Sequence, residues 1–529
     1  MKYLLVSGKI WFFAFTIQVL ILLPATAKTF YVAKNGSDKK GDGTVTHPWF
    51  SLPFAIRNNA LHPGDLIQLS AGVFILSEPV ILPKGISLHG VDEHTIITGS
   101  FYFQIADTDY HHHSEKFLIQ VPVAADQTIS NLVLDGQSRQ LHGGLFIGKS
   151  ERTLVTHLLV RDFNWSGIWL FESSQCEVSY IKLFNNAYQH KNNSTGNLQI
   201  FKVADLKLHH LFIKETRWAY GIKTYTIDWT TKDWWNAAVG TITNLEISDN
   251  YIDVPELGGW VVPETDIHAP DIAIELQGVD LLSVNIHHNW LNNHISAVLK
   301  RWGSTGQTLH IHHNIFDIHR WGYAIELNQD YVEVDHNLFF GGQHPFAQWQ
   351  GDRTNRGMHI HHNYITGLNT DAGYNGIMHW IGGIDSLFFN NNTIVFETSP
   401  KNPLFYSDRK NAFSNTALRN NIFINLTDTT RASVFYIESK GLFDTNFTRG
   451  FTDFKNNLSS TDLAADSSSG YRVLLVNKNS ALYGAGSALG YPTDRQLLPV
   501  GAFSEKELWQ AGPDQKWRET VVNSFYRIE

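Results

Sequence analysis

Residues 284–289 read Val284-Asn285-Ile286-His287-His288-Asn289, and the same phrase returns as Leu309-His310-Ile311-His312-His313-Asn314, Val332-Glu333-Val334-Asp335-His336-Asn337 and Met358-His359-Ile360-His361-His362-Asn363. Weaker copies end at Asn392 and Asn421, so the final asparagines are 25, 23, 26, 29 and 29 residues apart. Apolar and polar residues alternate before each asparagine, which is the periodicity of a β-strand. Strands that recur at this spacing, with no helical segment between them, favour a coil of parallel strands over a β-α-β sheet.

The same rhythm is present upstream, in residues 132–136, 158–162, 181–185 and 211–214. Gly and Asn at the turns supply the left-handed backbone angles that a sharp corner needs. Equivalent residues of adjacent coils in such a fold lie about 4.8 Å apart. We therefore expect the repeated asparagines to form a hydrogen-bonded row along the stack.

The N-terminal part of the repeat region carries a more specific signal. It reads Thr29-Phe30-Tyr31-Val32-Ala33-Lys34-Asn35-Gly36-Ser37-Asp38, then Gly41-Asp42-Gly43-Thr44, His47-Pro48-Trp49-Phe50-Ser51-Leu52, His62-Pro63-Gly64-Asp65-Leu66-Ile67-Gln68-Leu69 and Ala71-Gly72-Val73-Phe74. This opening resembles the first coil and N-terminal cap of the pectate-lyase-like superfamily of secreted β-helix proteins. Together with the repeats, the resemblance covers about residues 29 to 425.

The resemblance implies an all-β chain that folds as a single-stranded, right-handed parallel β-helix with an N-terminal cap and a C-terminal capping region. It also implies a polysaccharide or oligosaccharide as the partner. The superfamily contains lyases, glycoside hydrolases, epimerases and non-enzymatic surface proteins, so the fold does not name the reaction. The Asp-Pro-His-Asp signature of alginate epimerases and the Arg-x-Pro-x-x-Arg run of common pectate lyases are absent.

The N-terminus predicts export. Lys2 and Lys9 precede an apolar run from Ile10 to Leu23, and an Ala-x-Ala site ends at Ala27. These features are typical of a cleaved signal peptide over residues 1–27, which indicates a secreted or periplasmic protein of a bacterium and no transmembrane segment after cleavage. Cys176 is the single cysteine, so no intrachain disulfide can form. The net charge of −9 argues against nucleic acid as a partner.

We predict three parts after this division: the signal peptide, a β-helix domain over 28–450, and a capping region or small appended unit over 451–529. Within the β-helix, residues 217–270 are rich in Trp and Tyr and interrupt the period. We interpret this segment as an insertion loop, because long loops on rigid scaffolds often carry binding residues. Lys223 and Trp260 are its candidate substrate-binding residues.

Catalytic candidates come from the coil register. Glu275 lies 14 residues before Asn289, Lys300 lies 14 before Asn314, and the phrase Ala-Ile-Glu-Leu around Glu275 returns around Glu326. The register predicts an outward column of Glu275, Lys300 and Glu326 at one-coil spacing. Further substrate-binding candidates near this column are Asp271, Arg301, Trp302, His319, Arg320, Trp321 and Asn328.

Two carboxylates two coils apart suit the acid and base of an inverting glycoside hydrolase. Lyase chemistry instead needs a base and a cation that neutralises a uronate carboxylate, and Lys300, Arg301 or Arg320 would supply the cation. The alternatives are a charge-paired surface ladder without chemistry and a non-catalytic carbohydrate-binding or cell-surface protein of the same fold.

The repeated histidine pairs invite comparison with metal sites. They occupy a recurrent strand-to-turn position, and no His-Glu-x-x-His or cysteine-containing zinc spacing is present. We therefore predict no metal site and no firm cofactor from the sequence. Calcium stays possible, because carboxylates such as those of Asp266, Asp271 and Glu275 are suitable ligands. The sequence leaves the oligomeric state open.

Overall fold

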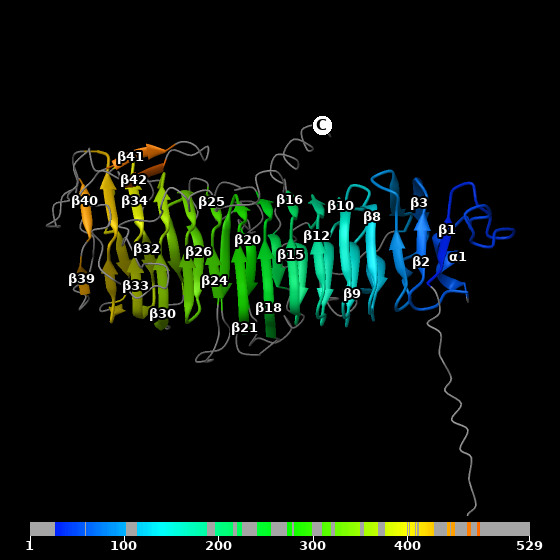
Figure 1. The fold of residues 1–529 in the computed structure, drawn as a ribbon, viewed down its shortest axis with the longest axis horizontal. Helices are drawn as coiled ribbons and strands as arrows, with labels where there is room; N and C mark the ends of the chain where they lie inside the picture. The colour runs from blue at the N-terminus through cyan, green and yellow to red at the C-terminus, as the bar shows by residue number, and fades with distance from the viewer. Residues whose placement is uncertain are drawn as a thin grey trace, which may run out of the picture.

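The computed structural model describes residues 27–449 apart from a set of interruptions, together with 463–466 and 473–476. The longest interruptions within that span are 102–113, 188–195, 225–240, 255–271, 299–308 and 428–441. The described chain is nearly all β-strand, and its strands stack one coil after another along a single axis (Figure 1). The fold is a parallel β-helix, as the repeats predicted.

One wall of the helix is a 12-stranded, all-parallel sheet, here called sheet B. Its strands are β4 (Val80–Ile81), β7 (Phe117–Val121), β9 (Gly143–Gly148), β11 (Ser166–Phe171), β14 (Gly196–Phe201), β17 (Tyr220–Thr224), β20 (Ile272–Gln277), β23 (His294–Val298), β26 (Tyr323–Asn328), β29 (His344–Gln348), β32 (Met378–Trp380) and β35 (Phe405–Ser407).

The remaining wall, sheet A, has 28 strands in two parallel columns separated by a sharp corner. The first column contains β1 (Thr29–Val32), β2 (Leu66–Leu69), β5 (Ser87–His89), β8 (Thr128–Asp135), β10 (Leu154–Arg161), β12 (Glu177–Ser179), β15 (Ala204–His209), β18 (Thr241–Ser248), β21 (Asp280–His287), β24 (Leu309–His312), β27 (Val332–Asp335), β30 (Thr354–His361), β33 (Gly383–Asn390), β36 (Phe413–Ser414), β37 (Ala417–Arg419) and β39 (Leu442–Asp444).

Strands β8 and β10 continue through the corner into the second column. That column also contains β3 (Gly72–Leu76), β6 (Thr95–Gly99), β13 (Lys182–Phe184), β16 (Phe212–Lys214), β19 (Tyr251–Asp253), β22 (Trp290–Leu291), β25 (Ile315–Ile318), β28 (Leu338–Gly341), β31 (Tyr364–Thr366), β34 (Thr393–Phe396), β38 (Ile422–Asn425) and β40 (Phe447–Arg449).

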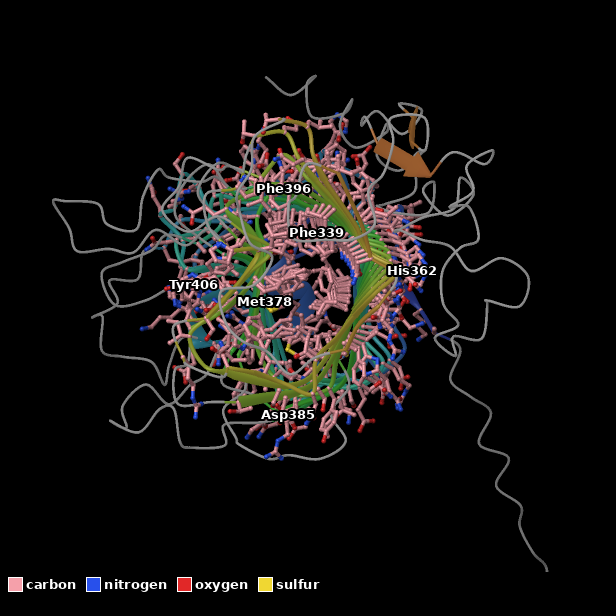
Figure 2. The ribbon with its side chains drawn as sticks, turned by 90° about the vertical axis from the view of Figure 1, so that its left-hand side faces the viewer. Phe339, His362, Met378, Asp385, Phe396 and Tyr406 are labelled. Carbon is pink, nitrogen blue, oxygen red and sulfur yellow. The ribbon has the colours of Figure 1, made fainter. Side chains whose placement is uncertain are left out.

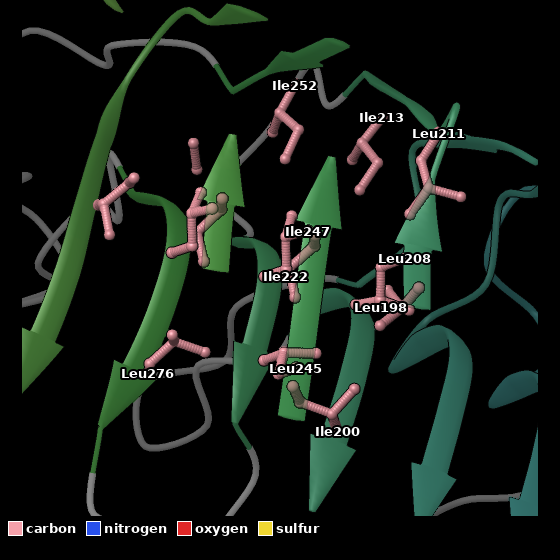
Figure 3. Packing of buried hydrophobic residues seen from close by; sticks show 14 of the residues in the cluster. Leu198, Ile200, Leu208, Leu211, Ile213, Ile222, Leu245, Ile247, Ile252 and Leu276 are labelled. Carbon is pink, nitrogen blue, oxygen red and sulfur yellow. The ribbon is translucent and has the colours of Figure 1, made fainter. Parts of the chain in front are cut away.

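The core lies inside the coil. Alternate residues of every strand point inward, so Leu198, Ile222 and Leu276 of sheet B face Leu208 and Ile247 of sheet A (Figure 3). The end view shows the same division: Phe339, Met378 and Phe396 lie within the ring of strands, whereas Asp385 lies on its outside (Figure 2). The inward row of both sheets is apolar. The outward residues of sheet A are largely part-exposed, whereas outward residues of sheet B such as Gln199 and Glu326 are also buried.

The corner between the two columns of sheet A explains the repeated asparagines. The residue before each one has left-handed backbone angles, for example φ of 54° at His288 and 52° at His362. The oxygen of each asparagine side chain then bonds the backbone of the preceding coil: Asn314 Oδ1 accepts from Asn289 N at 3.0 Å, and Asn337 Oδ1 accepts from Asn314 N at 2.9 Å. The predicted row is confirmed. It runs through the asparagines at 250, 289, 314, 337, 363, 392, 421 and 446, two more than the sequence had indicated.

The first coil carries helix α1 (Leu52–Arg57), which begins where the Ser51 side chain accepts a hydrogen bond from Phe54 N. Leu52 and Ala55 of this helix belong to the apolar core, and the ring of Trp49 stacks on Phe30 with centroids 5.2 Å apart. Burial of one face of α1 against the first strands is the arrangement expected of an N-terminal cap.

The predicted interruption at 217–270 needs correction. Strands β17, β18 and β19 fall inside it and continue the coil, since β17 pairs with both β14 and β20, and β18 pairs with both β15 and β21. These residues alternate inward and outward like those of any other coil, so 220–224 and 241–254 are scaffold. The remaining parts, 225–240 and 255–271, lie outside the described residues, as does Trp260.

In the predicted capping region 451–529, the described residues are the antiparallel strands β41 (Leu463–Asp466) and β42 (Val473–Val476). The predicted signal peptide lies outside the described residues up to position 26. No helix in the described part of the chain is long and apolar enough to cross a membrane.

Candidate functional site

A column of polar side chains runs along the outer face of sheet B. Strand pairing places Gln199 beside Lys223, Lys223 beside Glu275, Glu275 beside Ser296 and Ser296 beside Glu326, each on the next coil. The residues on either side of Glu275 and Glu326 along their strands belong to the apolar core, which makes both carboxylates point away from it. The predicted placement of Glu275 and Glu326 in one outward column is confirmed.

The predicted middle member of this column was wrong. Ser296 pairs with both Glu275 and Glu326 and takes the position assigned to Lys300. The prediction of Lys300 applied the 14-residue offset of Glu275 to the next coil, but the distance there is 18 residues, from Ser296 to Asn314. Lys300 itself lies outside the described residues.

A lysine does join the column, one coil earlier than predicted. Lys223 Nζ forms an ion pair with the carboxylate of Glu275, and the two side chains are 5% and 4% exposed. The ammonium also lies 3.9 Å from the centre of the Tyr220 ring, within the range of a cation–π contact. Moving both charges out of water is costly, so their mutual contact is essential for either to be buried there.

Glu326 is held differently. Its Oε1 accepts a hydrogen bond from Asn328 Nδ2 at 3.0 Å, and its Oε2 accepts one from Tyr323 OH at 3.4 Å. Asn328, a predicted substrate-binding residue, therefore lies in the site and contacts a predicted catalytic residue. All three side chains come from β26, where residues two or three apart are close enough to bond.

Gln199 is a site residue that the sequence analysis missed. Its side chain is fully buried, and within the described structure neither its amide oxygen nor its amide nitrogen has a hydrogen-bond partner. A buried amide without partners costs about 1–3 kcal/mol per group. Such an amide next to Lys223 is therefore suited to bind the hydroxyl or carboxyl group of a ligand. The equal spacing of Gln199 and Lys223 from the strand starts at Gly196 and Tyr220 could have revealed it.

The remaining predicted site residues are not described by the structure. They are Asp271, Lys300, Arg301, Trp302, His319, Arg320, Trp321 and Trp260. Of the predicted set, the structure thus brings together Lys223, Glu275, Glu326 and Asn328.

No family model and no curated protein sequence matches the chain. Solved structures similar to it include the pectate lyase Pel9A, with 12% identity over 91% of this chain and 97% of that chain and a TM-score of 0.37. Others are the Agl-KA catalytic domain (12%, 74% and 62%, TM-score 0.39) and the mannuronan C-5 epimerase AlgE6 A-module of Azotobacter vinelandii (11%, 75% and 91%, TM-score 0.35). The parallel β-helix of this chain rests on its own strand pairing.

The identities to these structures are too low to carry over a reaction, a substrate or a catalytic residue. The chemistry of the site therefore has to be argued from its own residues. Two outward carboxylates, one buried ammonium and two side-chain amides lie within the span of five adjacent strands, β14, β17, β20, β23 and β26.

Proposed function

We propose that the protein is a carbohydrate-active enzyme that cleaves a polysaccharide on the outer face of sheet B. The observation that supports this proposal is the position of Glu275 and Glu326 in one outward column with a single strand between them. Adjacent strands lie about 4.8 Å apart, so the backbones carrying the two carboxylates are about 9.6 Å apart. Inverting glycoside hydrolases hold their acid and base about 6.5–9.5 Å apart, which leaves room for a water molecule.

The surroundings of the two carboxylates suit different roles. Glu275 contacts the ammonium of Lys223, and we assign it the role of general base. Glu326 is then the general acid, and Asn328 and Tyr323 hold its carboxyl group in place. Ser296 occupies the strand position between the two glutamates.

Lys223 supports a second candidate reaction, a polysaccharide lyase. An ammonium buried beside a polar column is a suitable anchor for the carboxylate of a uronic acid, which must be neutralised before the adjacent proton is removed. Glu275 would in that case be displaced from Lys223 by the substrate and would act as the base. Both carboxylates are less than a tenth exposed.

The test is a panel of neutral and acidic polysaccharides incubated with the purified protein. New reducing ends without absorbance near 235 nm indicate hydrolysis, whereas both signals together indicate a lyase. With an active substrate, Glu275→Gln and Glu326→Gln are expected to lower turnover at least about a hundredfold, the low end for a general acid or base. Glu177→Gln, on the outer face of sheet A, is the control and should leave turnover unchanged.

Full turnover in both variants would refute the assignment of the site. Binding of a polysaccharide without cleavage would favour the alternative, a non-catalytic carbohydrate-binding protein. Export is part of the same proposal, because a polysaccharide substrate lies outside the cell. We expect the protein to be recovered outside the cytoplasm with Lys28 as its first residue, which N-terminal sequencing would establish.

A further inference from the structure

The outer face of sheet A carries two rows of polar side chains next to the left-handed corner. The corner residue of each coil is the left-handed residue between the two columns of sheet A, such as His288 or His313. Row one consists of the residues three positions before the corner residue: Glu177, Lys207, Glu246, Asn285, His310, Glu333 and His359. Row two is the residue directly before the corner residue and contains Ser179, His209, Ser248, His287, His312, Asp335 and His361. Strand pairing places the members of each row on successive coils.

A regular diagonal contact connects the rows. The Nε2 atom of a row-two histidine lies near an oxygen of the row-one residue on the preceding coil. The distances are 3.2 Å for His209 and Glu177, 3.4 Å for His287 and Glu246, 2.9 Å for His312 and Asn285, and 3.1 Å for His361 and Glu333. In each pair, one imidazole contacts one side-chain oxygen.

The diagonal at β24 and β27 has the two residue types exchanged. Row one has the histidine, His310, and row two has the acid, Asp335, and the Nε2 of His310 contacts the Oδ1 of Asp335. Glu333 is the direct strand neighbour of His310 and also lies two residues from Asp335. One imidazole nitrogen and two carboxylates therefore converge, with their ligand atoms all within 4.8 Å of one another.

We propose that His310, Glu333 and Asp335 form a binding site for a divalent transition-metal ion, with Zn²⁺ as its best-suited occupant. A zinc ion bonds imidazole nitrogen at about 2.0–2.1 Å and carboxylate oxygen at about 2.0–2.2 Å. Two such ligands at tetrahedral angles lie about 3.3 Å apart. His310 Nε2 and Asp335 Oδ1, which are in contact, therefore need to part slightly to admit the ion, and the Glu333 carboxylate lies within 4.8 Å of both. Calcium fits less well, because it prefers six to eight oxygen ligands.

Two neighbouring histidines hold the carboxylates in place. His361 Nε2 lies 3.1 Å from Glu333 Oε1, and His336 Nδ1 lies 2.6 Å from Asp335 Oδ2, the oxygen that does not face His310. Metal-binding carboxylates are commonly oriented by such outer hydrogen bonds, which fix the ligand geometry. The two carboxylates also give the site a negative charge that attracts a dication.

The site is open on its solvent side. The side chains of His310 and Glu333 are 37% and 49% exposed, whereas that of Asp335 is 9% exposed. Three protein ligands with free positions facing solvent is the arrangement of a zinc ion that also binds water or a substrate oxygen. The site lies on sheet A, away from the sheet B column, and does not depend on the proposed carbohydrate chemistry.

Metal binding by the full-length, untagged protein tests the proposal. After treatment with a chelator, the protein is titrated with ZnCl₂ by calorimetry, and with CoCl₂ to record the visible absorption of coordinated Co²⁺. We expect one equivalent of tightly bound metal. Asp335→Asn and His310→Gln should weaken this binding at least about a hundredfold, beyond the 10- to 100-fold loss typical of an outer partner.

Two further variants make the result unambiguous. Glu333→Gln changes the most exposed ligand and is expected to fold normally, so it tests the site even if Asp335→Asn does not fold. His287→Gln, on an ordinary diagonal, is the matched control and should retain one equivalent of metal. Absence of tight Zn²⁺ binding, or binding that is equal in Glu333→Gln and the parent protein, would overturn the proposal. Preference for CaCl₂ over ZnCl₂ would also overturn it.

Discussion

Replacing Asn314 with Ala tests the asparagine row at its centre. The Asn314 side chain makes four hydrogen bonds: Oδ1 accepts from Asn289 N and Asn289 Nδ2, and Nδ2 donates to Ile286 O and Asn337 Oδ1, all at 2.9–3.0 Å. In the variant, Asn289 N–H loses this acceptor at a fully buried position. Asn289 Nδ2 keeps its bond to Ile247 O, and Asn337 Oδ1 keeps its bond from the backbone of residue 314.

The expected loss follows from these contacts. One stranded, buried backbone N–H costs about 1–3 kcal/mol, and each further lost hydrogen bond costs about 1 kcal/mol when its partner retains another. With three such further bonds lost, we expect Asn314→Ala to lower the free energy of unfolding by about 4–6 kcal/mol. With a urea m-value of about 3 kcal/mol/M, the unfolding midpoint would fall by roughly 1.5–2 M.

Equilibrium unfolding in urea, followed by circular dichroism and tryptophan fluorescence, measures this change. Asn292→Ala is the matched control on the adjacent coil, because its Nδ2 bonds only side-chain oxygens, those of Tyr251 and Asp253, at a half-buried surface position. The control should lose less than about 1 kcal/mol. Equal midpoints for Asn314→Ala and the parent protein would refute the view that the row stabilises the corner.

Three other outcomes are expected. Burial lowers the pKa of His313 to about 4 and that of His362 well below its ordinary value of 6.5. Between about pH 6.5 and 4 the unfolded chain therefore binds more protons than the folded protein, so the urea midpoint should fall as the pH drops through this window. The fall should be less steep in His313→Asn. An equally steep fall in that variant would contradict the lowered pKa of His313. Gly341→Ala should destabilise the protein by at least about 1 kcal/mol, because φ is +80° and a Cβ would lie 2.1 Å from Ile318 O; a midpoint equal to that of the parent would exclude this strain. Small-angle scattering should give an elongated particle and circular dichroism mostly strand, and a compact, helix-rich result would contradict the β-helix.

The sequence alone determined the fold and the row of asparagines. Apolar residues alternate before each asparagine, and only a stack of parallel strands buries that alternation while it places Asn314 and Asn337 one coil apart. The duplicated Ala-Ile-Glu-Leu also placed Glu275 and Glu326 correctly in one column. These features depend on the alternation of inward-facing and outward-facing residues, which the geometry of a strand sets, so the sequence alone predicts them.

Only the tertiary structure shows which residue lies between Glu275 and Glu326 and which side chains contact one another between coils. The chain from sheet B to the corner varies in length from coil to coil, so only strand pairing shows that Ser296, and not Lys300, stands between the two glutamates. Lys223 reaches Glu275 from 52 positions away, across a segment that the sequence had suggested was a loop. The contact between His310 and Asp335 could not be predicted from the sequence either. Diagonal contacts between the two rows depend on the register and spacing of the strands, which the local sequence does not specify.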